Sequence, residues 1–227
     1  VRFSGDLSGP GGLTYASSAP LILTGTNSYA GPTTITAGTL QIGNDAATGS
    51  LGAGPVVNHG TLRFDRTGTL LVPNDISGAG GLTIDCPIGA GTVVLGGRNS
   101  FTGGVNVRSG ALRISNGSAL GTGSKTITMF HGTTGNPQLR LDGSASDITL
   151  PATIRFATSN ASGSLFNEAG RNIVQGDFIL SGGGGNTKII VEAGTLTLNG
   201  DLAPNFTGRN LDLSGTGNGT VNGAITD

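Results

Sequence analysis

Three arginines occupy the positions in this sequence that are best suited to contact a ligand. Arg63, Arg113 and Arg140 are the central residues of the triplets Leu-Arg-Phe, Leu-Arg-Ile and Leu-Arg-Leu. Successive side chains of a β-strand point to opposite faces, so the apolar residues of each triplet are predicted to point inward and the arginine outward. Stacking of these strands would form a column of guanidinium groups on one outer face, in register with Gln41 and Thr197.

Two interpretations of this column remain open. β-Helical polysaccharide lyases use outward Arg, Lys and Asp side chains in a groove, so the column is a candidate carbohydrate contact. However, Asp65 and Asp142 follow two residues after Arg63 and Arg140, on the same face. This spacing favours a solvated ladder of ion pairs, each of which contributes less than about 1 kcal/mol. No pair of carboxylates has the arrangement that glycoside hydrolysis requires.

The other reactive side chains do not combine into a site. His59 and His131 precede glycines of matching motifs, but they lie about three turns of the predicted fold apart, roughly 15 Å, which is too far to share a metal ion. The glycine run 182–185 lacks the Lys-Ser/Thr of a phosphate-binding loop. Cys86 is expected to be a small buried side chain. We therefore predict no catalytic, cofactor-binding or metal-binding residues, and no enzymatic activity.

The composition indicates a β protein with many turns. The chain has 227 residues, of which 43 are glycine, while 11% are charged and 35% are hydrophobic. Glycine supplies the backbone conformations of tight turns. The net charge of −1 argues against nucleic acid as a partner. No apolar run approaches the roughly 20 residues of a membrane helix. The chain begins at Val1 without a signal peptide, so we expect it to be a mature or excised piece of a secreted protein.

The sequence contains a long internal repeat. Asp6-Leu-Ser-Gly-Pro-Gly-Gly-Leu-Thr returns later in the chain as Asp75-Ile-Ser-Gly-Ala-Gly-Gly-Leu-Thr. Asn27-Ser-Tyr-Ala-Gly returns, at nearly the same offset, as Asn99-Ser-Phe-Thr-Gly. We predict one domain over residues 1–227, made of a unit at 6–74, a second unit at 75–146 and divergent turns at 147–227.

A shorter period lies within the long one. The pattern apolar-x-x-Gly-Thr/Ala-Leu-x-apolar occurs around Gly38, Gly60, Gly110 and Gly194, and in a degenerate form around Gly132. Together with weaker matches, these glycines recur at a nearly regular interval. The spacing predicts an all-β, single-stranded, right-handed parallel β-helix (solenoid) of about nine coils, with 21–31 residues in each coil. Both ends show strand-like sequence without a cap, so we expect either flanking coils or end-to-end stacking of subunits.

The two best copies resemble a known family. Gly11-Gly-Leu-Thr followed by residues 21–40, and Gly80-Gly-Leu-Thr followed by residues 92–112, are similar to the autotransporter-associated β-strand repeat, also called the passenger-associated transport repeat. The match is specific within these two copies and thin beyond Asn116. Residues 15–20 depart from the family pattern, and the third unit keeps only Glu192-Ala-Gly-Thr-Leu clearly. The resemblance implies a secreted, β-helical passenger region of a bacterial surface protein, without a set of catalytic residues.

The resulting functional prediction is a non-catalytic structural stem of an extracellular, passenger- or adhesin-type bacterial protein. One alternative is a self-assembling subunit of an extracellular fibre or sheath, stacked through its terminal strands. A second alternative is a carbohydrate-binding or polysaccharide-degrading β-helix. The expected partners are a second copy of the chain, or host or surface glycans and proteins. Nucleic acid is not expected, and contact with a membrane is expected only through a translocator outside this chain.

Overall fold

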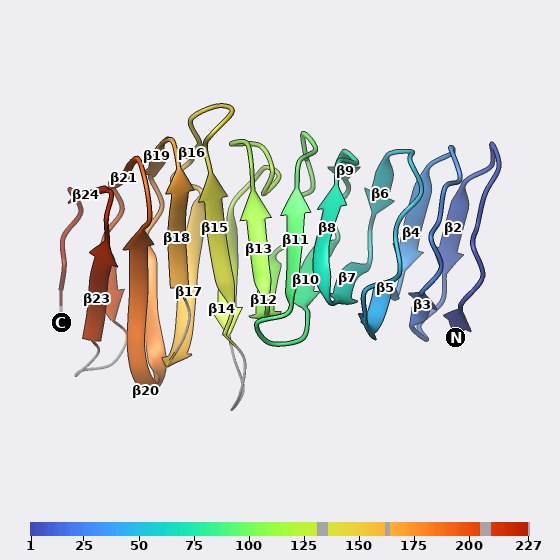
Figure 1. The fold of residues 1–227 in the computed structure, drawn as a ribbon, viewed down its shortest axis with the longest axis horizontal. Helices are drawn as coiled ribbons and strands as arrows, with labels where there is room; N and C mark the ends of the chain where they lie inside the picture. The colour runs from blue at the N-terminus through green and yellow to red at the C-terminus, as the bar shows by residue number, and fades with distance from the viewer. Residues whose placement is uncertain (131–135, 162–163, 205–209, 227) are drawn as a thin grey trace.

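The structure is a computed structural model that describes residues 1–130, 136–161, 164–204 and 210–226. The described chain consists of short β-strands joined by turns, and it winds into one continuous parallel solenoid (Figure 1). None of the described segments forms a helix that is long and apolar enough to cross a membrane.

Three faces make up each coil. The first face contains, in order of stacking, β1 (Arg2–Phe3), β3 (Leu21–Leu23), β5 (Thr39–Ala46), β7 (Thr61–Arg66), β10 (Gly81–Asp85), β12 (Val105–Ser109), β14 (Lys125–Phe130), β17 (Ile154–Ala161), the first part of β20 (Phe178–Val191) and β22 (Leu202–Pro204). The second face contains β8 (Gly68–Val72), β11 (Gly91–Leu95), β13 (Ala111–Ile114), β15 (Gln138–Asp142), β18 (Ser164–Ala169), the second part of β20 and β23 (Asn210–Gly215).

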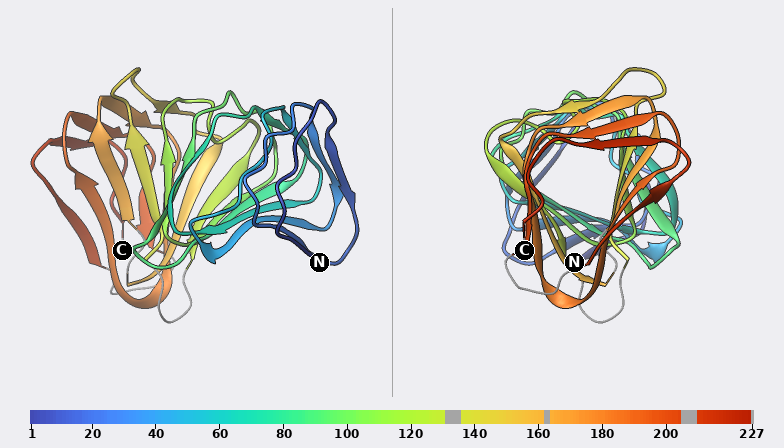
Figure 2. Two further views of the ribbon diagram at one scale, coloured as in Figure 1. Left: turned by 45° about the vertical axis from the view of Figure 1, so that its right-hand side comes forward. Right: turned by 90° about the vertical axis from the view of Figure 1, so that its left-hand side faces the viewer.

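The third face carries two shorter sheets, one toward each end of the solenoid. The sheet near the N-terminus contains β2 (Leu13–Ala16), β4 (Thr33–Ala37), β6 (Val56–Asn58) and β9 (Ile76–Ser77). The sheet near the C-terminus contains β16 (Thr149–Leu150), β19 (Arg171–Val174), β21 (Thr195–Leu198) and β24 (Asn218–Val221). Viewed along the axis, the three faces enclose one continuous interior (Figure 2).

Strand pairing sets the length of each coil. On the first face, parallel pairing leads from Arg2 through nine successive steps to Ala203. The shortest step leads from Ile22 to Gln41, and the longest leads from Thr128 to Ala157. The prediction of about nine parallel coils is therefore confirmed, while the shortest coils fall slightly below the predicted range of lengths.

The solenoid is right-handed. In Figure 1 the chain advances from the N-terminus on the right to the C-terminus on the left. The strands of the second face run upward on the near side, and those of the first face run downward behind them. This is the hand that parallel crossover connections favour, and it agrees with the sequence-based expectation.

Alternation of side chains builds the core. Leu40, Ile42, Leu62 and Phe64 are fully buried on the first face, as the triplet pattern predicts. Leu112 and Ile114 are buried in the same way on the second face, and so are Leu139 and Leu141. Phe156 and Phe178, which are partners in adjacent coils, stack with their ring centroids 4.6 Å apart. The interior is thus a continuous apolar column closed by the three faces.

Glycines at the corners allow neighbouring coils to approach closely. Gly38, Gly110 and Gly194 adopt positive φ angles of 72°, 75° and 71°, which strain other residues. Gly60 lacks this conformation, but a Cβ atom added there would lie 2.4 Å from the carbonyl oxygen of Gly38. The predicted corner at Gly132 lies outside the described residues.

Candidate functional site

The structure separates the three arginines that the sequence placed in one column. Arg113 on β13 and Arg140 on β15 are direct partners in adjacent coils of the second face. Arg63 on β7 lies on the first face, where its partners are Gln41 and Thr83. Thr197, the other residue assigned to the column, lies on the third face opposite Ile173 and Thr220.

The reason for this separation is the variable position of the glycine corner. The same Gly-Thr/Ala-Leu motif leads into the first face after Gly60, into the second face after Gly110 and into the third face after Gly194. A local motif therefore predicts which side chains point outward, but not the face on which they lie. The structure therefore places Arg113 and Arg140 side by side, whereas Arg63 and Gln41 lie together on the first face and Thr197 lies on the third.

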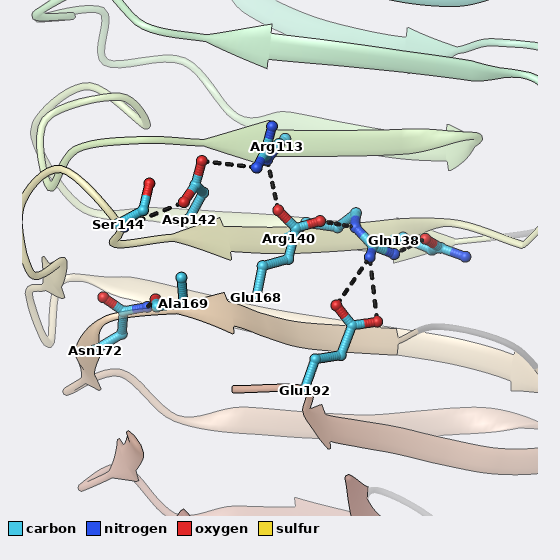
Figure 3. Close-up of polar contacts among 9 residues, drawn as sticks. All are labelled: Arg113, Gln138, Arg140, Asp142, Ser144, Glu168, Ala169, Asn172 and Glu192. Carbon is cyan, nitrogen blue, oxygen red and sulfur yellow. Dashed lines mark hydrogen bonds and ion pairs between the residues drawn. The ribbon is translucent and has the colours of Figure 1, made fainter. Parts of the chain in front are cut away.

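Arg113 and Arg140 form a ladder of ion pairs with carboxylates from three coils (Figure 3). Arg113 contacts Asp142 at 2.7 Å and Glu168 at 2.5 Å. Arg140 also contacts Glu168, and it reaches Glu192 at 3.2 Å. We call these five residues the arginine–carboxylate ladder. The partners differ from those that the sequence suggested, because Asp142 contacts Arg113 of the preceding coil rather than Arg140 of its own strand.

Neighbouring groups fix the geometry of the ladder. The Arg140 guanidinium lies over the ring of Phe166, 4.3 Å from its centroid, and donates a hydrogen bond of 2.8 Å to Gln138 Oε1. Burial alone would raise the pKa of Asp142, but hydrogen bonds from Ser144 and the charge of Arg113 outweigh it and lower the pKa. Asp142 is therefore held as a carboxylate, and the ladder presents ordered donors and acceptors on the second face.

Arg63 belongs to a second charged cluster, on the first face. Its guanidinium lies 3.1 Å from Asp65 and 3.0 Å from Asp85, and Asp85 also lies 3.8 Å from Arg108. Asp65 is only 5% exposed, and it accepts a hydrogen bond from Gln41 Nε2 at 3.2 Å. Burial raises the pKa of Asp65, although Arg63 acts in the opposite direction. Gln41 is likewise buried, because this cluster covers it, whereas the sequence placed it in solvent.

Lys125 is a buried cation that sequence reasoning missed. Its ammonium group donates hydrogen bonds to the carbonyl oxygens of Phe101 at 2.7 Å and Leu120 at 2.9 Å. The same group lies over the Phe101 ring, 4.1 Å from the centroid. Burial lowers the pKa of Lys125 to about 8. The only sequence signal is a lysine at the start of a strand in which threonine and apolar residues alternate, and that pattern does not distinguish a buried amine from a solvated one.

The remaining candidates have simple structural roles. His59 is exposed at its corner, and its backbone N–H donates to the carbonyl oxygen of Ile35 at 2.7 Å. His131 lies outside the described residues. Within those residues, no three His, Cys, Asp or Glu side chains are placed to hold a metal ion. Cys86 is fully buried, as expected, and burial raises the pKa of its thiol.

Comparisons with known proteins support the resemblance seen in the sequence. Residues 13–42 and 88–114 match the family model of the passenger-associated-transport-repeat. The chain is also similar to the adhesin BmaC autotransporter of Brucella suis biovar 1 (strain 1330), with 35% identity over 217 residues. That alignment covers 86% of this chain and 6% of the relative, so the chain spans a small part of the relative's length. No solved structure matches the chain.

Proposed function

Since the chain belongs to the passenger-associated transport repeat family, we propose that it is a non-catalytic structural stem within the passenger of a bacterial surface adhesin. The observation that carries this proposal is the unbroken parallel pairing from β1 to β22, with an apolar interior along its whole length. Such a solenoid is stabilised coil by coil and acts as a stiff spacer. The proposed location is the bacterial cell surface or the extracellular medium.

Deleting this segment from the full-length protein displayed on cells tests the stem function. Nine coil steps of about 4.8 Å each correspond to a rod of about 40 Å. The deletion is therefore expected to shorten the distance between the membrane and the distal passenger by about that length, measured by electron cryotomography. Display and adhesion are expected to persist. Loss of adhesion with unchanged display would instead assign ligand binding to this segment.

A second candidate function, binding of carbohydrate, is favoured by the arginine–carboxylate ladder. A chain of sugar hydroxyls presents both donors and acceptors, and the ladder offers guanidinium and carboxylate groups side by side, together with the Gln138 amide. The two positive and three negative charges of the ladder nearly balance, so a neutral saccharide fits this surface better than a polyanion does.

A glycan array with matched variants tests this second function. Arg113→Ala removes a guanidinium from the ladder, whereas Arg63→Ala removes a comparable ion-paired guanidinium from the first face. If the ladder binds carbohydrate, the array signal is lost with Arg113→Ala and is retained with Arg63→Ala. Absence of any glycan signal with the unaltered chain, or equal loss in both variants, rejects the ladder as a carbohydrate site.

A further inference from the structure

The first two coils of the first unit are joined by a reciprocal pair of side-chain hydrogen bonds. Asp6 Oδ1 accepts the backbone N–H of Thr26 at 2.6 Å. One residue further along each coil, Asn27 Oδ1 accepts the backbone N–H of Leu7 at 2.9 Å. Each coil therefore supplies one side-chain acceptor and one backbone donor. We call this arrangement the Asp–Asn clasp.

The second unit contains the same clasp. Asp75 Oδ1 accepts the N–H of Arg98 at 2.7 Å, and Asn99 Oδ1 accepts the N–H of Ile76 at 2.8 Å. This agreement is expected, because the two aspartates and the two asparagines are matched positions of the sequence repeat.

The divergent stretch contains a third clasp. Asp147 Oδ1 accepts the N–H of Arg171 at 2.8 Å, and Asn172 Oδ1 accepts the N–H of Ile148 at 2.8 Å. Along the chain, the spacing between the second and third clasps nearly equals the spacing between the first and second. The segments that match the family model, 13–42 and 88–114, both end before this clasp.

The residues around each asparagine follow from the geometry of the clasp. Two positions before it lie Gly25, Gly97 and Gly170, where an added Cβ atom would lie 2.2, 2.1 and 2.5 Å from a carbonyl oxygen of the preceding coil. Only glycine permits this approach. Two positions after the asparagine, a buried apolar side chain enters the core, and these residues are Tyr29, Phe101 and Val174. The local pattern is therefore Gly-x-Asn-x-apolar in all three cases.

We infer that residues 147–227 begin with a third copy of the repeat, and that the Asp–Asn clasp is the device that fixes which coil stacks on which. Coils of similar sequence can pair in a wrong register, and a shift reverses the faces on which side chains lie. In a shifted pairing both side chains lose their backbone donors, and the loss is costly at the asparagine, because that side chain is buried in all three clasps. The clasp closes only when the first and second coils of a copy are adjacent.

The third copy departs from the others after its second coil. The side-chain amides of Asn27 and Asn99 donate forward, to the carbonyl oxygens of Ser50 and Ala119, both at 2.7 Å. Asn172 instead donates to Asn167 Oδ1 and to the Ala169 carbonyl oxygen. The copy thus preserves the link between its first two coils and loses the link to the third, which explains why its sequence similarity fades.

Amide hydrogen exchange of the folded chain tests the inference. Asp147→Ala removes the acceptor of the Arg171 N–H, and Asp75→Ala removes that of the Arg98 N–H. Each is expected to accelerate exchange of its own amide by at least about fivefold, in keeping with the net value of about 1 kcal/mol for a hydrogen bond. Asp147→Asn and Asp75→Asn keep an oxygen acceptor and are expected to retain most of the protection. Acceleration at Arg98 without a matching acceleration at Arg171 overturns the third copy.

A deletion experiment covers the case in which a point variant does not fold. Removing residues 75–146 joins Asn74 to Asp147, so that Asp147 takes the place of Asp75. This deletion is expected to yield a shorter solenoid with a β-type circular dichroism spectrum and a cooperative thermal transition. The control deletion of residues 75–140 joins Asn74 to Leu141 within β15 and is expected to unfold. If both deletions fold equally well, or the first does not fold, the equivalence of the two aspartates is rejected.

Discussion

At the scale of single residues, Lys125 is a charged side chain that is almost fully removed from water. Its charged amine lies in the turn region between two coils, with two carbonyl oxygens and an aromatic ring as its partners. No ion pair of Lys125 with a carboxylate is found among the described residues. Burying a cation in this way favours the neutral amine, and the pKa of about 8 follows from it.

This environment predicts a stability that depends on alkaline pH. The folded chain releases the Lys125 proton near pH 8, whereas the unfolded chain holds it up to the ordinary lysine value of 10.5. Below pH 8 both states are protonated and the cost of burial is fully present. Between these two pKa values the unfolded state binds more protons, so the free energy of unfolding is expected to rise with pH. The Lys125 contribution reaches about 3 kcal/mol, since one pKa unit corresponds to about 1.4 kcal/mol.

Urea denaturation from pH 7 to pH 10.5 measures this dependence. Lys125→Met keeps the length of the side chain and removes the titrating amine, so it serves as the control. Cys86, whose pKa burial raises, has the opposite pH dependence but is present in both proteins. The difference between the two proteins therefore isolates Lys125. Parallel curves across this range would contradict the assignment.

At the scale of elements, the approach of neighbouring coils determines where glycine is required. Gly96 and Gly97 are adjacent in the sequence and follow β11. A Cβ atom on Gly97 would lie 2.1 Å from the carbonyl oxygen of Asn74, whereas the nearest atom to a Cβ on Gly96 is the Leu71 Cδ1 at 3.7 Å. The two positions thus form a matched pair within one turn.

Alanine substitution is expected to destabilise the fold strongly at Gly97 and hardly at all at Gly96. Gly97→Ala forces the backbone of two coils apart and strains the clasp at Asn99, so we expect a loss of roughly 2–4 kcal/mol in the free energy of unfolding. Gly96→Ala meets only an ordinary contact and is expected to change that free energy by less than about 0.5 kcal/mol. Thermal unfolding followed by circular dichroism measures both. Equal destabilisation by the two variants would mean that coil spacing does not set the glycine requirement.

The strands that carry the arginines show that the direction of a side chain can be predicted from the sequence, whereas the face of the solenoid on which it lies cannot. Alternation around Arg63, Arg113 and Arg140 correctly predicted the inward and outward side chains, because period-2 geometry is local to a strand. The face that each arginine occupies depends on the number of residues in every preceding corner. Because the coils differ in length, the residues next to an arginine do not reveal the face on which it lies. The clasp of the third copy was missed for a related reason. Its partners, Asp147 and Asn172, lie in different coils and show no hydrophobic period.

At the scale of the whole molecule, charge and apolar surface are distributed differently. The charged clusters lie along the outer faces, where ion pairs between adjacent coils and between next-nearest coils satisfy them. The large exposed apolar side chains include Val1 and Phe3 in the first coil, and Leu213 and Ile225 in the last. Leu71 and Ile88 are also exposed, but they lie between the ends. Because backbone groups are paired along the sides and apolar side chains gather at both ends, the preferred direction for association is along the axis.

This distribution predicts how the isolated chain behaves as its concentration rises. Its terminal strands, β1 at one end and β23 and β24 at the other, can pair with a second copy through backbone groups, while apolar side chains at both ends add buried area. Axial self-association is therefore expected. Sedimentation velocity over a concentration series, together with negative-stain electron microscopy, would show rods that lengthen without widening.

Phe3→Lys combined with Leu213→Lys places like charges at both ends and is expected to keep the chain monomeric. Leu71→Lys, which adds the same charge to an exposed apolar position on the second face, is the control and is expected to leave association intact. Monodisperse short rods of the unaltered chain at every concentration would remove the fibre or sheath alternative and leave the stem.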